Sequence, residues 1–387
     1  MSEALAMALL VSAQGLGYVR RSELLARASS ATNALENPRA YRGVLGEDGV
    51  RALEDALRGA DRLEKTLARE GVRVLTARDG EYPPLLRGIR RPPHALFVQG
   101  EANLADACTV AVVGTRRASE YGLRHTHRIA RELAEAGVCV VSGLALGVDA
   151  AAHSGALDAS GRTVAVLGGA LDRFYPAANR LLRERILKTG GRIVSEFPMG
   201  MRPTKYSFLL RNRIVAGMSL GVLVTQGARR SGALRTAHDA LDEGREVFAL
   251  PGSVDSALSQ LPHRLIADGA CVATCAQDIL DALVLEQPRG GHTGGKRAAQ
   301  GKGQARAARE ETAGAAQETD AKKPSGIPDG LSGEERAVLA ALSRGEMDFD
   351  ALCVATGIAG EELGGLLTLM ELDGHIEALP GLRYVRA

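Results

Sequence analysis

A series of short β-branched runs constrains the fold of this chain more than any other feature. The runs mostly alternate with stretches of helical periodicity. They occupy residues 72–76, 95–98, 110–113, 138–141, 164–167, 192–195, 222–225 and 247–250. Apolar runs of this length, separated by helices, are typical of buried parallel strands. The pattern therefore predicts a doubly wound α/β domain over about residues 70–285.

Composition divides the rest of the chain into three further parts. Residues 1–69 are rich in helical spacings, whereas residues 286–328 contain almost no large apolar side chains. That middle segment cannot bury enough apolar surface to fold, so we expect a flexible linker there. Residues 329–387 regain helical periodicity, with a capping box at Ser332 and Glu335 and a final segment typical of a hairpin. We expect this last part to be a winged helix.

Charge and composition limit the classes of function. The 48 Lys and Arg residues against 46 Asp and Glu residues give a formal net charge of +2, so nucleic-acid binding requires a local basic patch. Aromatic residues make up only 3% of the chain and Trp is absent. Only a few Phe and Tyr side chains are therefore available to stack on bases.

The cysteines and the N-terminus indicate a reduced, cytoplasmic protein. The five cysteines are Cys108, Cys139, Cys271, Cys275 and Cys353. Their number is odd and most lie in apolar runs, so we expect buried small side chains rather than disulfides or zinc ligands. Residues 1–13 are apolar, but Glu3 stands where a secretory signal carries basic residues. No apolar run approaches the roughly 20 residues of a membrane span, and we expect no metal or cofactor.

Four predicted strand-to-helix turns carry residues suited to binding anions. In chain order they contain Gly114-Thr115-Arg116, Ser142-Gly143, the segment 195–213 and Ser231-Gly232. Backbone N–H groups at a glycine turn and the positive end of a helix dipole attract anions. Since parallel strands end at one edge of a sheet, the turns predict a shared anion-binding rim. At any single turn, however, glycine can serve only to allow the turn.

Ser142, Asp149 and His153 raise the question of a hydrolase triad. The G-x-S-x-G elbow is absent, and Ser142 precedes its turn instead of occupying the tip. Asp149 and His153 fall four residues apart on one helical face, where holding the helix to its loop explains them as well as a ligand contact does. We expect no catalytic residue.

The segment 202–213 is the most informative for function. Lys205, Arg211 and Arg213 interleave with Tyr206 and Phe208 where a loop enters a helix. Cations neutralise phosphates and exposed rings stack on bases, which suits single-stranded nucleic acid. The alternative is that Phe208 belongs to the core and that the arginines form a solvated helix face.

In their order and spacing, these motifs resemble the DprA/Smf family along most of the chain. The matching segments are Tyr82-Pro-Pro-Leu-Leu, Gly114-Thr-Arg116, Ser142-Gly-Leu-Ala-Leu-Gly147-Val-Asp149 with His153, Tyr175-Pro176, Ser195-Glu-Phe-Pro, Arg211-Asn212-Arg213-Ile, Ser231-Gly232-Ala-Leu with Thr236-Ala, and Phe248-Ala-Leu-Pro251-Gly252. The resemblance implies an N-terminal SAM-like helical module, an extended Rossmann-like core and a C-terminal winged helix. It also implies a non-enzymatic homodimer that binds incoming single-stranded DNA in natural transformation and loads RecA recombinase onto it.

The resemblance also assigns site residues. The family's pocket carries over to Gly114, Thr115, Arg116, Lys205, Phe208, Arg211 and Arg213. We expect Ser142, Gly143, Asn212, Ser231 and Gly232 to complete the DNA-binding rim. The chain departs from the family at 259–263, where Ser-Gln-Leu-Pro-His replaces a Ser-x-Gly-x-Asn run, so no site is carried over there.

Two enzyme classes compete with DNA binding. Rossmann-like nucleotide phosphoribohydrolases use a Pro-Gly-Gly-x-Gly-Thr-x-x-Glu motif with a catalytic Glu, but residues 230–237 lack that Glu. Dinucleotide-dependent oxidoreductases need a G-x-G-x-x-G fingerprint, which is absent.

The presumptive recognition helix of the winged helix, residues 359–373, has the wrong charge for DNA. It contains Glu361, Glu362, Glu371 and Asp373 and no Lys or Arg. A helix in the major groove faces phosphates on both sides, so we expect this domain to contact protein.

Overall fold

The chain forms two compact units, Met1–Val284 and Leu285–Ala387, in the computed structural model. The structure describes residues 1–101, 107–229, 231–284, 332–343, 345–358, 360–372, 375–379 and 383–386. The predicted linker, residues 286–328, lies outside the described residues. The finer division into parts 1–69, 70–285 and 329–387 stays a prediction.

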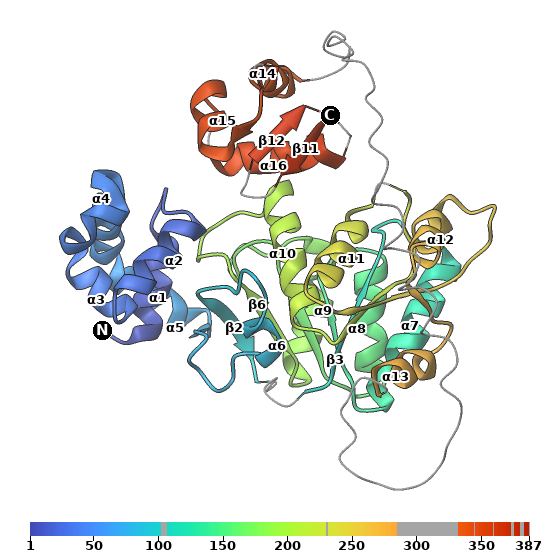
Figure 1. Ribbon diagram of the computed structural model, residues 1–387. Coiled ribbons are helices and arrows are strands. Elements are labelled where there is room, and N and C mark those ends of the chain that lie inside the picture. Colours follow the sequence, from blue (N-terminus) through green and yellow to red (C-terminus); the bar gives the residue numbers. More distant parts are fainter. Residues whose placement is uncertain are drawn as a thin grey trace, which may run out of the picture. The chain divides into compact units, whose positions relative to one another are not determined.

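The larger unit is built on a nine-stranded sheet with the order β1-β2-β6-β5-β4-β3-β7-β8-β9 (Figure 1). The strands are β1 (Arg73–Leu75), β2 (Leu96–Gly100), β3 (Thr109–Val113), β4 (Cys139–Ser142), β5 (Thr163–Val166), β6 (Arg192–Ser195), β7 (Gly221–Val224), β8 (Glu246–Ala249) and β9 (Cys271–Val272). All neighbours from β6 to β9 pair in parallel. The α/β prediction is confirmed.

The two strands at the β1 edge differ from the prediction. β1 pairs antiparallel with β2, and β2 pairs antiparallel with β6, so the expectation of parallel strands there was wrong. A parallel connection usually places a full helix against the sheet. The segment between β1 and β2, residues 76–95, is long enough for such a crossover, but its helix is only the four-residue α6 (Pro84–Arg87). β6 also carries Arg192, whose fully buried guanidinium donates to Glu81 at 2.7 Å.

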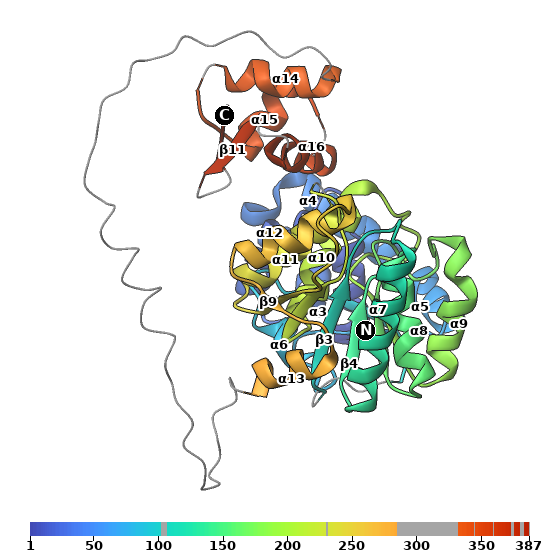
Figure 2. The same cartoon turned by 90° about the vertical axis from the view of Figure 1, so that its right-hand side faces the viewer.

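Helices cover both faces of the sheet (Figures 1 and 2). One face carries α7 (Glu120–Glu135), α8 (Val148–Asp158) and α13 (Ala276–Val284), and the other carries α6, α10 (Lys205–Gly217), α11 (Gly232–Asp242) and α12 (Gln260–Ala267). Side chains of β3 alternate between the two cores: Val110 and Val112 pack with α7 and α8, whereas Val113 packs with α10 and α11. The alternation follows from the two-residue period of a strand.

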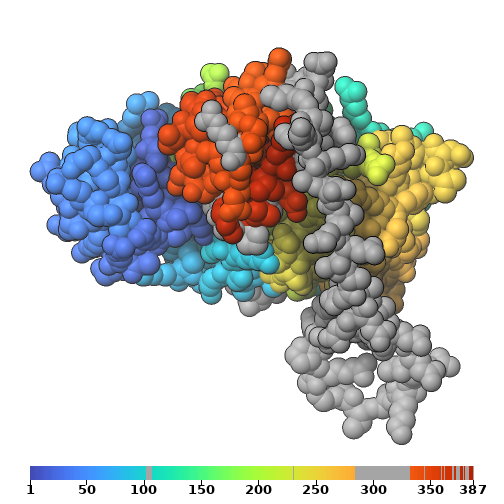
Figure 3. Space-filling view, turned by 45° about the horizontal axis from the view of Figure 1, so that its top comes forward, coloured from blue at the N-terminus to red at the C-terminus, as the bar shows by residue number. Residues whose placement is uncertain are grey.

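Five α-helices precede the sheet and extend its core. They are α1 (Glu3–Ser12), α2 (Tyr18–Arg27), α3 (Ala31–Glu36), α4 (Arg42–Arg58) and α5 (Ala60–Arg69). Their buried side chains share one apolar cluster with Phe97, Ile193 and Ile186 of α9 (Arg180–Lys188). These helices and residues 250–284 lie at opposite ends of the larger unit (Figure 3). The expected N-terminal helical part is confirmed.

The smaller unit has the secondary structure expected of a winged helix. Its helices are α14 (Gly333–Leu342), α15 (Phe349–Thr356) and α16 (Gly360–Leu372), and its strands, β10 (Met347–Asp348), β11 (Ile376–Leu379) and β12 (Arg383–Arg386), pair in the order β10-β12-β11. Ser332 and Glu335 form the predicted capping box. Val338, Leu352 and Leu367 belong to a separate apolar core.

The cysteines are less buried than expected. Cys139 is buried, but Cys108 and Cys271 are exposed, so the prediction of burial was wrong for these two. The reason for Cys271 is its place on β9, a two-residue strand at the sheet edge. Among the described residues, no three His, Cys, Asp or Glu side chains cluster as metal ligands. In the same parts of the chain, no helix is long and apolar enough to cross a membrane.

Candidate functional site

The predicted turns meet at the carboxyl edge of the sheet, around the switch point between β3 and β7. β3 lies between β4 and β7, and the helices that follow β3 and β7 cover opposite faces. Ligands of open α/β sheets bind in the crevice at such a point. Gly114, Thr115 and Arg116 directly follow β3, while Ser231 is the N-cap of the helix that follows β7.

The turn after β3 is held tightly by its neighbours. Thr115 N donates to the carbonyl of Gln226 at 2.8 Å, which joins the turn to the loop after β7. A Cβ on Gly114 would lie 2.6 Å from Val148 Cγ2 and 2.8 Å from Gln226 O. Glycine is therefore required here because of close protein packing. Arg116 itself projects into solvent.

A buried polar cluster supports the turn after β4. Asp149 Oδ2 accepts from Gly143 N at 3.2 Å and from Ala145 N at 3.3 Å. The Arg211 guanidinium rests against Gly143, where any Cβ would overlap it. Burial raises the pKa of Asp149, and the facing Arg211 charge opposes that rise. Arg211, which the sequence suggested as a phosphate ligand, is only 5% exposed and lies beneath the rim.

Ser142 and His153 are hydrogen-bonded to neighbouring strands. Ser142 Oγ donates to Val112 O at 2.7 Å. His153 Nδ1 lies 2.7 Å from Thr163 Oγ1, which donates its own proton to Val140 O, so Nδ1–H is the donor. Burial lowers the pKa of His153 to about 3, which keeps the ring neutral. These partners favour the structural interpretation over a hydrolase triad.

The start of α10 brings an aromatic ring next to two cations. The helix begins with a capping box between Thr204 and Ser207. Exposed Lys205 lies one helical turn before the half-buried Phe208. The ring of Phe208 sits against Gly168, where a Cβ would come within 2.5 Å of it. The Arg116 guanidinium lies over this ring, 5.0 Å from its centroid.

The remaining predicted residues of α10 have partners within the protein. Arg213 forms an ion pair with Glu196, and the two side chains are only 15% and 14% exposed. Asn212 Nδ2 donates to the carbonyl of Gly232 at 3.3 Å, which ties α10 to α11. The structure thus separates an exposed set, Arg116, Lys205 and the edge of Phe208, from residues that hold the helix in place.

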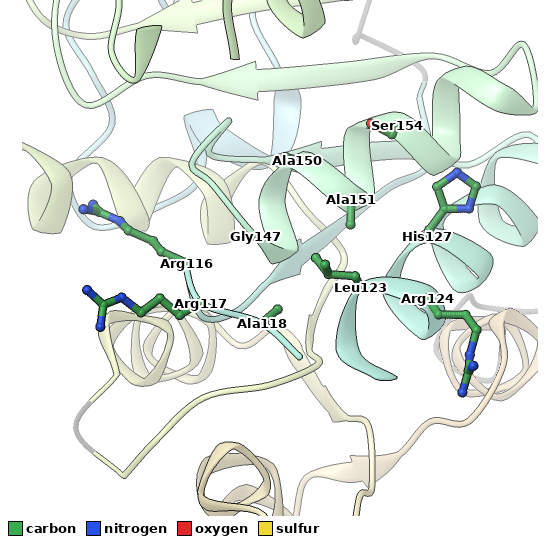
Figure 4. Close-up of a pocket in the computed structure, with 10 residues that line it drawn as sticks. All are labelled: Arg116, Arg117, Ala118, Leu123, Arg124, His127, Gly147, Ala150, Ala151 and Ser154. Atoms are coloured by element: carbon green, nitrogen blue, oxygen red, sulfur yellow. The ribbon is translucent and has the colours of Figure 1, made fainter. Parts of the chain in front are cut away.

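Sequence reasoning missed a second basic group beside Arg116. Arg116, Arg117 and Arg124 line a hollow of about 620 Å3 at the start of α7 and α8 (Figure 4). His127 lines it too, but its Nε2 pairs with Asp158 at 2.7 Å. Arg124 and His127 lie three residues apart on α7, so they share one helical face. That spacing was the signal available in the sequence.

Fold and site together define a class: an α/β protein with a basic and aromatic rim at the sheet's switch point and a separate winged-helix unit. The family described as DNA recombination-mediator protein A matches residues 73–284, and the DprA winged helix domain matches residues 321–381. The first match covers more than half of the chain. The chain therefore belongs to the DNA recombination-mediator protein A (DprA) family.

Individual relatives agree with this assignment. Protein Smf of Escherichia coli (strain K12) is 46% identical over 202 residues, or 52% of this chain and 54% of that protein, so the chain spans about half the length of that relative. DNA processing protein A of Streptococcus pneumoniae has a similar structure, with a TM-score of 0.61 and 34% identity over 70% of this chain and 95% of that chain. The Helicobacter pylori protein, described for its single-stranded DNA binding mode, has a TM-score of 0.50 and 32% identity over 56% of this chain and 96% of that chain.

Proposed function

We propose that this protein binds single-stranded DNA at the rim formed by Arg116, Lys205 and Phe208. The observation that carries the proposal is the Arg116 guanidinium held 5.0 Å over the Phe208 ring, with Lys205 exposed one turn away. Cations beside an aromatic platform provide phosphate neutralisation and base stacking without sequence readout. The single-stranded DNA binding described for the similar H. pylori protein supports this proposal.

The other predicted site residues complete the rim in two ways. Gly114, Thr115, Ser231 and Gly232 shape the turns that border it, and Ser231 caps α11 through a 3.3 Å hydrogen bond from Ala233 N. Residues under the rim set the position of its exposed side chains; they are Ser142, Gly143, Arg211, Asn212 and Arg213.

Family membership supports a wider role for this protein. We propose a cytoplasmic homodimer that protects incoming DNA during natural transformation and loads RecA recombinase onto it, without catalysing a reaction. The support is the family match over the core and the winged helix. The acidic character of α16, which has no Lys or Arg, fits a protein contact better than a DNA contact.

The direct test is fluorescence anisotropy of labelled oligo-dT across a salt series. We expect tight binding at low salt and a steep loss with added salt, with a slope of about −0.7 per neutralised phosphate. Arg116→Ala and Lys205→Ala should each weaken binding and flatten the slope. Arg131→Ala is the matched control, because Arg131 lies further along α7 and pairs with Glu135 at 2.8 Å.

Two outcomes would contradict the proposal. One is unchanged oligo-dT affinity in both Arg116→Ala and Lys205→Ala. The other is displacement of the oligonucleotide by AMP or NAD, which would assign the rim to a small nucleotide and favour the phosphoribohydrolase alternative.

A further inference from the structure

The hollow beside Arg116 has the shape and lining of a second nucleotide subsite. It has a volume of about 620 Å3 and lies between the first turns of α7 and α8. Its lining residues are Arg116, Arg117, Ala118, Leu123, Arg124, His127, Gly147, Ala150, Ala151 and Ser154. Asp158 pairs with His127 at 2.7 Å, but none of the lining residues is itself a carboxylate and three are arginines, so the hollow favours an anionic occupant.

The arginines of the hollow are available for a ligand. Within the described residues, Arg116, Arg117 and Arg124 have no ion pair, and none of them is buried. Further along the same helix, Arg128 and Arg131 each pair with a glutamate four residues on. In this part of the described chain, the guanidinium groups that have no ion pair are therefore the ones around the hollow.

The floor of the hollow consists of apolar and mostly small side chains. Figure 4 shows Leu123 of α7 facing Ala151 of α8, with Ala118 on the loop that leads into α7. Gly147 lies at its edge and lets the turn after β3 approach the start of α8: its φ is +75°, and a Cβ there would lie 2.5 Å from Thr115 O. Leu123 is 38% exposed, so part of its apolar side chain is available for contact. A base or a deoxyribose covers such a floor without specific hydrogen bonds.

Charges flank the floor on two sides. Arg116 and Arg117 extend to one side of the hollow, and Arg124 extends to the other (Figure 4). Two phosphates bracket each nucleotide of a strand, so cations on both sides suit a chain better than a mononucleotide. Arg116 belongs to both places, because it lines the hollow and also covers the Phe208 ring.

We propose that the hollow binds the nucleotide next to the one at Phe208, so that the same single strand runs from the rim onto the α7 side. Arg124 contacts the phosphate beyond that nucleotide, and Leu123 with Ala151 contacts its base or sugar. This proposal rests on the proposed function, since it extends the same DNA path.

The test compares oligo-dT of increasing length. Arg124→Ala should leave the shortest oligonucleotide that binds unaffected and weaken longer ones about fivefold, the effect of about 1 kcal/mol for one exposed phosphate contact. The salt slope for long oligonucleotides should fall by about 0.7. Ala151→Met fills the floor without changing charge, keeps a good helix former, and should also weaken only the longer oligonucleotides.

The controls separate this proposal from the proposed function. Arg131→Ala should bind all lengths as the unchanged protein does. Affinity for the shortest oligonucleotide reports in each variant whether the rim is intact. If Arg116→Ala weakens binding while Arg124→Ala and Ala151→Met leave every length unchanged, the subsite is wrong and the rim stands. If Arg116→Ala and Lys205→Ala also have no effect, the proposed function itself is wrong.

Discussion

Replacing Arg213 by Ala decides whether this residue binds phosphate or supports α10. Its guanidinium pairs with Glu196 and is only 15% exposed. In both side chains a second polar atom, Arg213 Nη1 and Glu196 Oε1, is buried and has no further partner. Removing the arginine therefore leaves a carboxylate, 14% exposed, without its counter-charge.

The structure sets the size of the expected loss. Breaking a buried ion pair from one side costs about 3–5 kcal/mol, because one charge stays uncompensated. The slight exposure of Glu196 admits some water, so we expect Arg213→Ala to lower the free energy of unfolding by about 3 kcal/mol. Replacing both partners, Arg213→Met with Glu196→Met, removes the stranded charge. The double variant should return to within about 1 kcal/mol of the unchanged protein.

Two measurements on the full chain suffice. Urea unfolding followed by far-UV circular dichroism gives the stability of each variant, and the winged-helix unit is common to all of them. Oligo-dT anisotropy gives the affinity, which should stay within about twofold for the double variant. The reasoning is refuted if Arg213→Ala keeps full stability but loses tenfold in affinity with a flatter salt slope, since Arg213 would then contact a phosphate.

Three further predictions follow from other parts of the structure. Gly143→Ala should destabilise the protein and weaken oligo-dT binding, because its Cβ overlaps the Arg211 guanidinium, whereas Gly232→Ala, with open space around it, should be neutral in both measurements. The arginines that bond Glu81 lower its pKa to about 2, so its ionised form adds stability above about pH 4.5 that is lost as the pH falls toward 2. In urea unfolding at a series of pH values, Glu81→Gln should therefore reduce the loss of unfolding free energy between about pH 4.5 and 2 by about 1–2 kcal/mol. This figure is lowered because the carboxylate is partly exposed to solvent. In a gel-shift assay residues 329–387 in isolation should not retard duplex DNA, and a clear shift would contradict the assignment of the winged helix to protein contact.

The sequence predicted most of the sheet because the strands that are buried on both faces have a strong signal. β3, β4 and β5 are fully buried, and their apolar runs are continuous. Direction was harder to predict, because a short apolar run such as β2 does not show which way it pairs. β1 pairs antiparallel with β2, and β2 pairs antiparallel with β6, which is about 90 residues further along the chain.

The candidate site was predictable in its residues but not in their roles. Arg116, Arg211 and Arg213 were all assigned to phosphate, yet only Arg116 is exposed. Arg211 and Phe208 lie three residues apart on α10 and face the sheet edge together. The partners that bury the arginines, Asp149 and Glu196, come from other elements, and a sequence does not show such long-range pairs.

The glycines after the strands explain why the roles changed. Gly114 and Gly143 were predicted to contribute to a backbone anion site, but each is packed against protein instead: the Arg211 guanidinium lies against Gly143, and Gly114 packs on Val148. The backbone N–H of Gly143 is already used by a carboxylate. If the proposed function holds, attraction for DNA comes from the side chains around these glycines, so single side-chain substitutions should remove more affinity here than at a site built from backbone N–H groups.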